Sequence, residues 1–444
     1  MPRAELGSWL QDPDPKTFPY DAVVRQYHRV GKHFVPAELL ATLSDVRDRL
    51  PAMHGPWSHV QMLASFLSTA LDKPDGRYDY TSYLALALLR LPEANDPVEQ
   101  APFARSRCDR LTAQLVCDAL AFELAAADGS TTLLPKMRPA QELVEKRCKH
   151  GLRAIRPALA RMSLDGGLTA DDPTELARQA CFMVRSDMSF AERLTLDICV
   201  LPVDTAHDEY LFLRVLQAFE TTFALLAMEI RGAIRAMTGR RVEQAEHYLA
   251  GAESALHDSA PLFSMLATMQ VESFRTFRQF TDGASAIQSR NYKIVESLCR
   301  RPDQERVDSA AYRWVPDVRE RVLAGQPTLD DAFREACESG DLTEADRERL
   351  STAMAGFAHA LTRWRHTHYR VAVRMLGTSA PGTGYTEGTP YLDAARSIPV
   401  FRSVEPAGPT SGDRAGEGRA GDGRAGEGKT TDDRAGGDRT ARTR

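Results

Sequence analysis

The sequence predicts an all-α protein. Apolar residues recur at three- and four-residue spacing, period-two alternation of β-branched residues is rare, and Val and Ile are sparse beside Leu and Ala. Residues that break helices fall between the periodic segments. The predicted helices span residues 36–50, 104–127, 139–162, 173–200, 207–238, 241–257, 285–300, 328–338 and 343–377.

The boundaries of these helices follow from local signals. Breaker segments at 51–57, 128–138 and 166–173 separate the earlier helices. The last helix has the clearest ends: Thr343 followed by Asp346 resembles a capping box. At its other end, Gly377 and the later Pro381 form a stop signal.

The C-terminal end has a different composition. From about residue 407 it contains no aromatic or large aliphatic residue, and RAGEG, RAGDG and RAGEG follow one another within 414–428. Such a segment buries too little apolar surface to offset its ordering entropy, so we expect 407–444 to be disordered. We expect an N-terminal helical region at 1–200 and a catalytic helical domain at 201–406.

Bulk composition narrows the class of protein. The net charge of −5 gives no reason to expect a nucleic-acid partner. The N-terminus lacks the apolar core of a signal peptide, and no apolar run approaches 20 residues, so no membrane span is expected. The cysteines are scattered, odd in number and never in a CxxC pair, which suits a reducing, cytoplasmic location. They are Cys108, Cys117, Cys148, Cys181, Cys199, Cys299 and Cys337.

Two histidines on the last predicted helix, His366 and His368, point roughly 200° apart because they are two residues apart. The helical neighbours of His366 are polar or cationic: Thr362, Arg363 and Arg370. Those of His368 are apolar: Trp364, Val371, Ala372 and Met375. A histidine on an apolar stripe is usually a hydrogen-bonded core residue. One neutral imidazole against an apolar pocket is also how a five-coordinate haem iron is held.

Three other segments carry candidate binding groups. In 274–289, Arg275 and Arg278 lie among three phenylalanines, where an arginine either stacks on the surface or clamps a carboxylate. The GTG in 381–388 lacks the spacing of a dinucleotide fingerprint and is either a flexible loop or a close backbone approach to a ligand. The helix at 207–234 is the most apolar, so we expect it to be buried on most sides and able to wall an aromatic substrate.

Taken in chain order, these segments resemble the tryptophan 2,3-dioxygenase superfamily. The family's HDExLF stretch is similar to 207–212, and its FR followed by FQS is similar to 277–289, with Ile in place of the Phe. The proximal-histidine segment WRxRHxxxxxRxIG is similar to 364–377, apart from Thr367 and Leu376, and a GTG follows one residue late. Upstream, the sequence from Tyr80 to Leu89 resembles YxxYLxLxxLL.

The resemblance implies a helical haem-binding bundle of the tryptophan/indoleamine dioxygenase type. His368 would be the iron ligand, with Trp364 and Ser285 beside the haem. Arg278 would bind the substrate carboxylate, and Thr383 its ammonium group.

The resemblance also implies how the pocket is walled and capped. Phe212 would line the ring pocket, and Tyr80, Tyr83 and Leu84, within a capping segment at 78–92, would close it. In relatives that segment comes from a neighbouring subunit, so a homo-oligomer, either dimer or tetramer, is expected.

Departures from the pattern favour another branch of this superfamily. Leu216 stands where the dioxygenases have a distal histidine, and we count it with His207 among the catalytic positions. Bulkier residues occupy 385–387, and more than 100 residues separate Tyr80 from His207. The stretch from 18 to 36 also resembles histidine-ligated haem oxygenases of bacterial secondary metabolism. Some of those bind haem through a cysteine where this chain has Ala372, so a non-covalent haem b is implied.

The expected function is therefore 3-hydroxylation of L-tyrosine or a modified tyrosine, with dioxygen or hydrogen peroxide as oxidant. Two alternatives stay open: a tryptophan or indole 2,3-dioxygenase, and a haem-binding protein without catalytic activity.

Overall fold

The computed structural model describes residues 2–53, 57–77, 79–92, 101–282, 284–382 and 388–404. Within these residues the regular secondary structure is helical apart from one isolated bridge between Lys136 and Ala206. The all-α prediction is confirmed. The predicted disordered segment, 407–444, lies outside the described residues.

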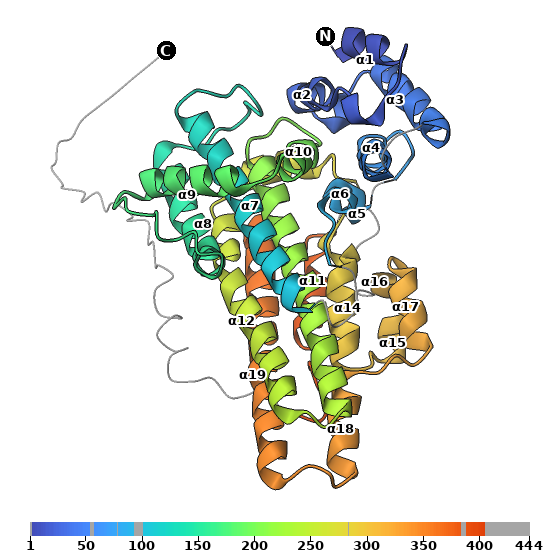
Figure 1. The fold of residues 1–444 in the computed structure, drawn as a ribbon, viewed down its shortest axis with the longest axis vertical. Helices are drawn as coiled ribbons and strands as arrows, with labels where there is room; N and C mark the ends of the chain where they lie inside the picture. Colours follow the sequence, from blue (N-terminus) through green and yellow to red (C-terminus); the bar gives the residue numbers. More distant parts are fainter. Residues whose placement is uncertain are drawn as a thin grey trace, which may run out of the picture. The chain divides into compact units, whose positions relative to one another are not determined.

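Five long helices form the centre of the fold, and they lie side by side in Figure 1. Helix α11 packs against α12 and α7, and α12 packs against α19 and α8. Their bounds are α7 Ala101–Ala127, α8 Gln141–Arg161, α11 Asp208–Thr238, α12 Val242–Leu266 and α19 Glu344–Leu376.

Helix α11 is buried on nearly every side, as its apolar sequence predicts. By length and composition alone it is apolar enough to cross a membrane, with a mean hydropathy of 1.4 over its most apolar window. However, 94% of that window is buried inside the protein. It is therefore the core helix around which the others pack.

Shorter helices surround these five. The N-terminal ones are α1 Pro2–Trp9, α2 Tyr20–Val30, α3 Ala37–Arg49, α4 Trp57–Ala70, α5 Tyr80–Tyr83 and α6 Leu86–Leu89. Next along the chain come α9 Pro173–Asp187, α10 Phe190–Ile198, α13 Val271–Arg278 and α14 Arg290–Cys299. The last are α15 Gln304–Val307, α16 Ala310–Arg313, α17 Pro316–Leu323, α18 Leu329–Glu338 and α20 Thr389–Arg396.

Several predicted helices differ from the observed ones; for example, the predicted helix 285–300 begins only at Arg290, after the turn Ala286–Gln288. The segment 173–200 divides because Ser189 and Glu192 form a capping box that begins α10. Helix α12 continues to Leu266, beyond the predicted end at 257, with Pro261 inside it. A proline removes one hydrogen bond but does not end a helix that is packed on several sides, as α12 is.

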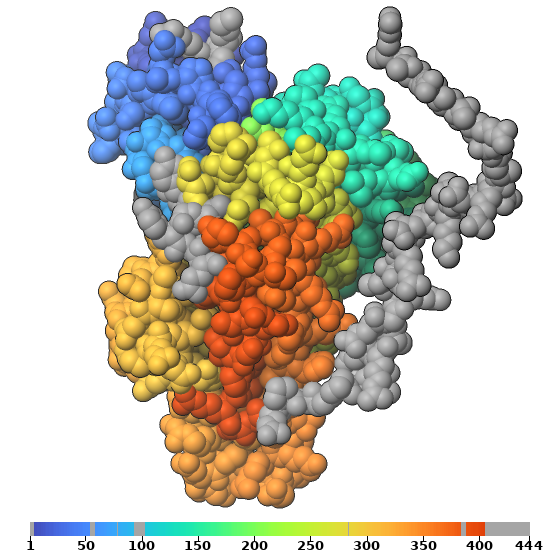
Figure 2. Space-filling view, turned by 180° about the vertical axis from the view of Figure 1, so that it is seen from behind, coloured from blue at the N-terminus to red at the C-terminus, as the bar shows by residue number. Residues whose placement is uncertain are grey.

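The described residues up to 404 belong to one compact unit, in which the predicted N-terminal region and catalytic region pack together. The reason is that α7 and α8 pack directly on α11 and α12. Figure 2 shows the opposite side of this unit, where the yellow residues around α13 meet the dark orange to red residues of α19 and α20.

Candidate active site

A cavity of about 210 Å³ lies among helices α5, α11, α12, α13, α14, α19 and α20. Most of the side chains that line it are apolar or aromatic. Those from α11, α12 and α13 are Phe212, Leu216, Phe219, Phe223, Phe263, Leu266, Phe274, Phe277 and Arg278. Those from α19 are Trp364, Arg365, His368, Val371, Ala372, Met375 and Leu376.

His368 borders this cavity from α19, whereas His366 does not. The ring of His368 lies 5.2 Å from the Trp364 ring and 6.2 Å from the Phe263 ring, measured between centroids. Burial lowers the pKa of His368 to about 4, so the imidazole is neutral at physiological pH. The contrast between the two histidines that the sequence predicts is therefore seen in the structure.

The indole of Trp364 also borders the cavity, and two aromatic rings of α11 contact it at steep angles, 88° for Phe219 and 74° for Phe223. Its ring lies 5.6 Å from Phe219 and 5.1 Å from Phe223. Its Nε1 is buried and has no hydrogen-bond partner among the described residues. A buried N–H without a partner is costly, and such atoms in native proteins often face a bound group.

Arg278, the last residue of α13, borders the cavity, whereas Arg275 on the same helix is exposed. The guanidinium of Arg278 donates a hydrogen bond of 2.7 Å to the carbonyl oxygen of Pro381. No ion pair joins Arg278 to a carboxylate within the described segments, and burial lowers its pKa. A half-buried guanidinium without a counter-ion is suited to receive an anionic group.

Two glycines that follow α19, Gly382 and Gly388, border the cavity. Gly388 has a φ of +72°, and a Cβ placed on it would lie 2.2 Å from the carbonyl oxygen of Ala380. A side chain is therefore excluded at that position. Thr383, predicted to hold the substrate's ammonium group, lies outside the described residues.

Phe212, Leu216, Phe219 and Phe223 contribute one continuous apolar wall from α11. They recur at three- and four-residue spacing, so they share a face of the helix. Leu216 lies in the middle of this wall and has neither a hydrogen-bond donor nor an acceptor. Ser285, which precedes the turn Ala286–Gln288, borders the same cavity.

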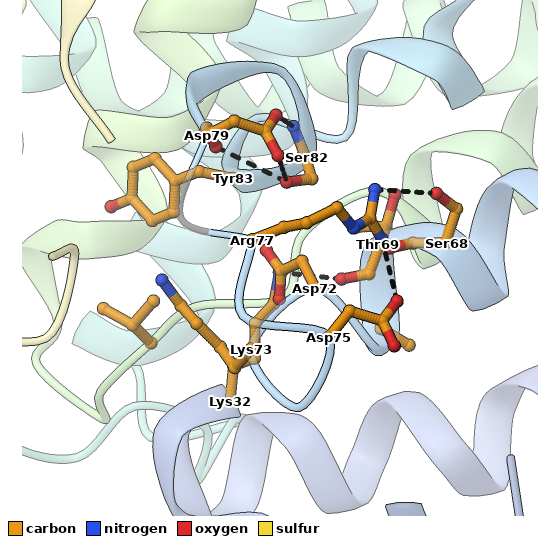
Figure 3. Close-up of polar contacts among 12 residues, drawn as sticks. Lys32, Ser68, Thr69, Asp72, Lys73, Asp75, Arg77, Asp79, Ser82 and Tyr83 are labelled. Atoms are coloured by element: carbon orange, nitrogen blue, oxygen red, sulfur yellow. Dashed lines mark hydrogen bonds and ion pairs between the residues drawn. The ribbon is translucent and has the colours of Figure 1, made fainter. Parts of the chain in front are cut away.

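Tyr80 and Tyr83 border the cavity from α5 of the same chain. Asp79 caps this short helix by accepting hydrogen bonds from the Ser82 N–H at 2.8 Å and the Ser82 hydroxyl at 2.7 Å (Figure 3). The Tyr80 N–H donates to Gln288 Oε1 at 3.0 Å. In this structure the chain's own segment therefore borders the cavity, and its supply by a neighbouring subunit stays a prediction.

A buried ion pair anchors the loop that leads to α5. The Lys32 ammonium lies 3.0 Å from Asp72 Oδ2 and also donates to the Thr69 carbonyl oxygen (Figure 3). Both side chains are 1% exposed, so each charge depends on the other for compensation. The pair joins the loop between α4 and α5 to the residues after α2.

His207 is not among the residues that border the cavity. Its Nε2 lies 3.2 Å from Glu123 Oε2, and its ring stacks on Phe122. The same Glu123 and Asp208 bind Arg147 from α8 at 2.8 and 2.7 Å, all without exposed side-chain surface. In this position His207 helps to fasten the start of α11 to α7 and α8. Its predicted catalytic role stays a prediction, for a residue that lies outside the cavity lining.

No protein-family model matches this chain. A protein named tryptophan 2,3-dioxygenase from Nocardioides sp. strain JS614 is 30% identical over 224 residues, which cover 44% of this chain and 82% of that one. The chain belongs to the tryptophan 2,3-dioxygenase superfamily. The family resemblance predicted from the motifs is thereby confirmed.

Other superfamily members align at lower identity. Proteins with the same name are 26% identical over 257 residues in Polaromonas sp. strain JS666 and 24% identical over 311 residues in Paraburkholderia phytofirmans. The first alignment covers 49% of this chain and 86% of the relative, and the second covers 60% and 95%. Relatives of this superfamily are thus matched over most of their length, whereas this chain has much additional sequence.

Two polar residues that line the cavity were not predicted from the sequence. Lys293 and Tyr391 both border the cavity, and the Lys293 ammonium donates to the Tyr391 hydroxyl at 2.7 Å. Lys293 is 1% exposed and lies 3.6 Å from Glu296. The available signal was a lysine within the otherwise apolar part of a predicted helix, but its partner lies on α20, which the sequence did not predict.

Proposed function

We propose that this protein is a haem-dependent oxygenase of aromatic amino acids, in which His368 would hold the iron of a non-covalent haem b. The observation that supports this most is a neutral imidazole that borders a largely apolar cavity. A neutral imidazole is the form that ligates haem iron. Bound haem would supply the iron at which dioxygen or hydrogen peroxide reacts.

The residues around His368 fit such a group. Val371, Ala372 and Met375 extend the apolar surface of α19 beside the imidazole, and Trp364 adds a flat aromatic ring one turn before it. No cysteine is among the lining residues, which favours a haem held without a thioether bond. In this proposal Ser285 lies beside the haem edge.

The substrate is held by groups that suit an aromatic amino acid. Arg278 pairs with its carboxylate through the bidentate geometry that guanidinium provides, and Thr383 holds its ammonium group. Phe212, with Phe274 and Phe277 within 5.6 Å of it between ring centroids, forms an aromatic wall beside Arg278. Fixing both ends of the molecule orients the ring for reaction and excludes water from it.

We propose ring hydroxylation of L-tyrosine or a modified tyrosine as the reaction. Leu216 supports this choice because it offers no hydrogen-bond partner for an indole N–H. With hydrogen peroxide as co-substrate, one ring C–H becomes C–OH and the second peroxide oxygen leaves as water. With dioxygen, an external reductant supplies two electrons and one oxygen atom again leaves as water.

Tryptophan 2,3-dioxygenation is the second candidate function. The names of the relatives favour it, including the 30% identical protein from Nocardioides. An apolar distal residue does not prevent attack of dioxygen on an indole ring. The two candidates differ in the amino acid that binds and in the product that forms.

A non-catalytic haem-binding protein is the third candidate. Arg278 borders the cavity and has no carboxylate partner among the described residues. A protein that only binds haem has no need of such an arginine, which argues against this candidate. Failure of every aromatic amino acid to perturb the haem spectrum would favour this candidate over both enzymes.

An optical titration separates these candidates. The haem-loaded protein is titrated with L-tyrosine and, separately, with L-tryptophan, and peroxide or dioxygen with a reductant is then added. A Soret shift with tyrosine followed by a catechol product is the expected result. A response to tryptophan alone, with formation of N-formylkynurenine, would replace hydroxylation by dioxygenation.

A further inference from the structure

Helix α11 carries a buried carboxyl group, that of Glu220, directly behind the wall of the cavity. Its side chain has no exposed surface and accepts hydrogen bonds from the Ser289 hydroxyl at 2.5 Å and the Asn291 amide at 3.1 Å. The hydroxyl of Tyr80 is a further partner. These groups, from α5 and from the start of α14, are the ones that face it. No cation in the described part of the chain opposes its charge, and burial raises its pKa to about 7.

Two of these three partners border the cavity, namely Tyr80 and Ser289. The Ser289 hydroxyl oxygen accepts the Tyr292 N–H at 3.2 Å while its own proton is directed to Glu220. Glu220 itself does not border the cavity. One layer of hydroxyl groups therefore separates an ionisable carboxyl from any molecule bound there.

The position of Glu220 on α11 adds to this argument. It lies one helical turn after Leu216, which stands in the cavity wall and cannot exchange a proton. The rest of the α11 wall consists of phenylalanines. The α11 residues of the wall therefore provide no acid–base group. The Tyr80 and Ser289 hydroxyls connect the cavity to one, the carboxyl of Glu220.

Another buried glutamate, Glu209, has a different environment. Its carboxylate accepts hydrogen bonds from the backbone N–H groups of Val203 and Asp204, at 2.6 and 3.0 Å, and from the Tyr83 hydroxyl at 3.2 Å. Two backbone donors within the preceding loop give it a structural role. Glu220 has only side-chain partners, two of which reach the cavity.

We propose that Glu220 is the proton reservoir of the cavity and exchanges protons with bound ligands through the hydroxyl groups of Tyr80 and Ser289. This inference rests on the proposed oxygenase function, because activation of peroxide and loss of the ring hydrogen both require proton movement. A ligand proton passes to a hydroxyl oxygen while that hydroxyl's own proton passes to the carboxylate. Only O–H bonds and the ligand's bond to its proton change, no electrons are transferred, and the reverse step returns the proton. Tyr80 and Ser289 touch the ligand, and Glu220 acts through them.

The chain offers a matched control in Glu229, which lies on the same helix. It is also buried, and burial raises its pKa to about 7 as well. It does not border the cavity, and the charge that opposes it is that of Arg105. Glu220→Gln and Glu229→Gln therefore make the same chemical change on the same helix, but only Glu220→Gln removes a group behind the cavity wall.

The first experiment follows product formation by the haem-loaded protein as a function of pH. The wild-type rate should change with a midpoint near pH 7. Glu220→Gln should abolish this transition and lower the rate about 10- to 100-fold, a range typical of a lost acid–base group. Glu229→Gln should keep the transition and the rate. A transition that persists in Glu220→Gln, or that disappears equally in Glu229→Gln, would overturn the proposal.

The second experiment does not depend on turnover. The infrared carboxylic-acid band that disappears in Glu220→Gln should titrate near pH 7 in the wild type and move in Tyr80→Phe and Ser289→Ala. Ser289→Thr keeps the hydroxyl and should restore the wild-type band. A band that neither variant moves would overturn the proposal. If neither amino acid gives a product, the proposed oxygenase function is wrong. The infrared result would still show whether the Tyr80 and Ser289 hydroxyls are coupled to Glu220.

Discussion

At the scale of single residues, the two arginines of α13 allow a direct test of how the substrate carboxylate is bound. Arg278 borders the cavity and has no carboxylate partner among the described residues, whereas Arg275 is exposed. Arg278→Leu should weaken binding of the aromatic amino acid about 10- to 100-fold, because a hydrogen-bonded ion pair contributes roughly 1.5–3 kcal/mol. Haem content should stay unchanged, and Arg275→Leu should bind as the wild type does. If both variants bind the amino acid with equal affinity in an optical titration, Arg278 does not bind the substrate carboxylate.

A second prediction at this scale concerns pH and stability. Burial raises the pKa of Glu229 to about 7, above its usual value of 4.5. The folded state therefore keeps a proton that the unfolded state loses, and the stability that this proton contributes is lost as pH rises through 7. Glu229→Gln should stabilise the protein by up to about 3 kcal/mol at pH 8 and by little at pH 4.5. Urea unfolding at both pH values measures this, and equal gains at both would contradict it.

At the scale of secondary-structure elements, the four-residue helix α5 depends on its surroundings, because so short a helix is not stable alone. Asp79 caps this helix. Two buried hydrogen bonds also hold it in place, one from the Tyr80 N–H to Gln288 and one from the Gln217 amide to the Leu84 carbonyl oxygen. Asp79→Ala should cost about 1 kcal/mol locally, speed amide exchange in 80–84 and weaken substrate binding. Asp75→Ala, which removes only the more exposed ion pairs to Arg47 and Arg77, serves as the control. If amide exchange in 80–84 is unchanged in Asp79→Ala, the Asp79 cap does not keep Tyr80 and Tyr83 in their positions.

The same scale shows what a sequence can predict. Periodicity identified α11 and α19, and therefore Phe212, Leu216 and His368, because one face of a long helix is visible in the sequence alone. It did not identify α20 and gave no bounds for the helix that ends near Arg278, α13; each is only eight residues long. The contact that places His207 away from the cavity was invisible, because its partner Glu123 lies 84 residues away. The contact between Glu220 and Ser289, 69 residues apart, was likewise invisible, since only the packing of α14 on α11 creates it.

At the scale of the whole molecule, the chain's own N-terminal region completes the cavity. Tyr80 and Tyr83 belong to the same chain as His368, and more than 100 residues that include α7 and α8 lie between α5 and α11. We propose that any homo-oligomer of this protein contains a complete site in each subunit. Mixing a Tyr80→Ala variant with an Arg278→Leu variant should then restore no activity after subunit exchange. Recovery of activity in the mixture would show that sites are shared between subunits.

The most direct test of the central claim compares His368→Ala with His366→Ala. The two histidines are two residues apart on α19, but only His368 borders the cavity. The ferric Soret spectrum and the haem content of each purified variant are measured beside those of the wild type. Loss or a strong shift of the Soret band in His368→Ala, with a wild-type spectrum in His366→Ala, is the predicted result. An unaltered spectrum in His368→Ala would contradict the assignment of His368 as the axial ligand and, with it, the proposed haem site.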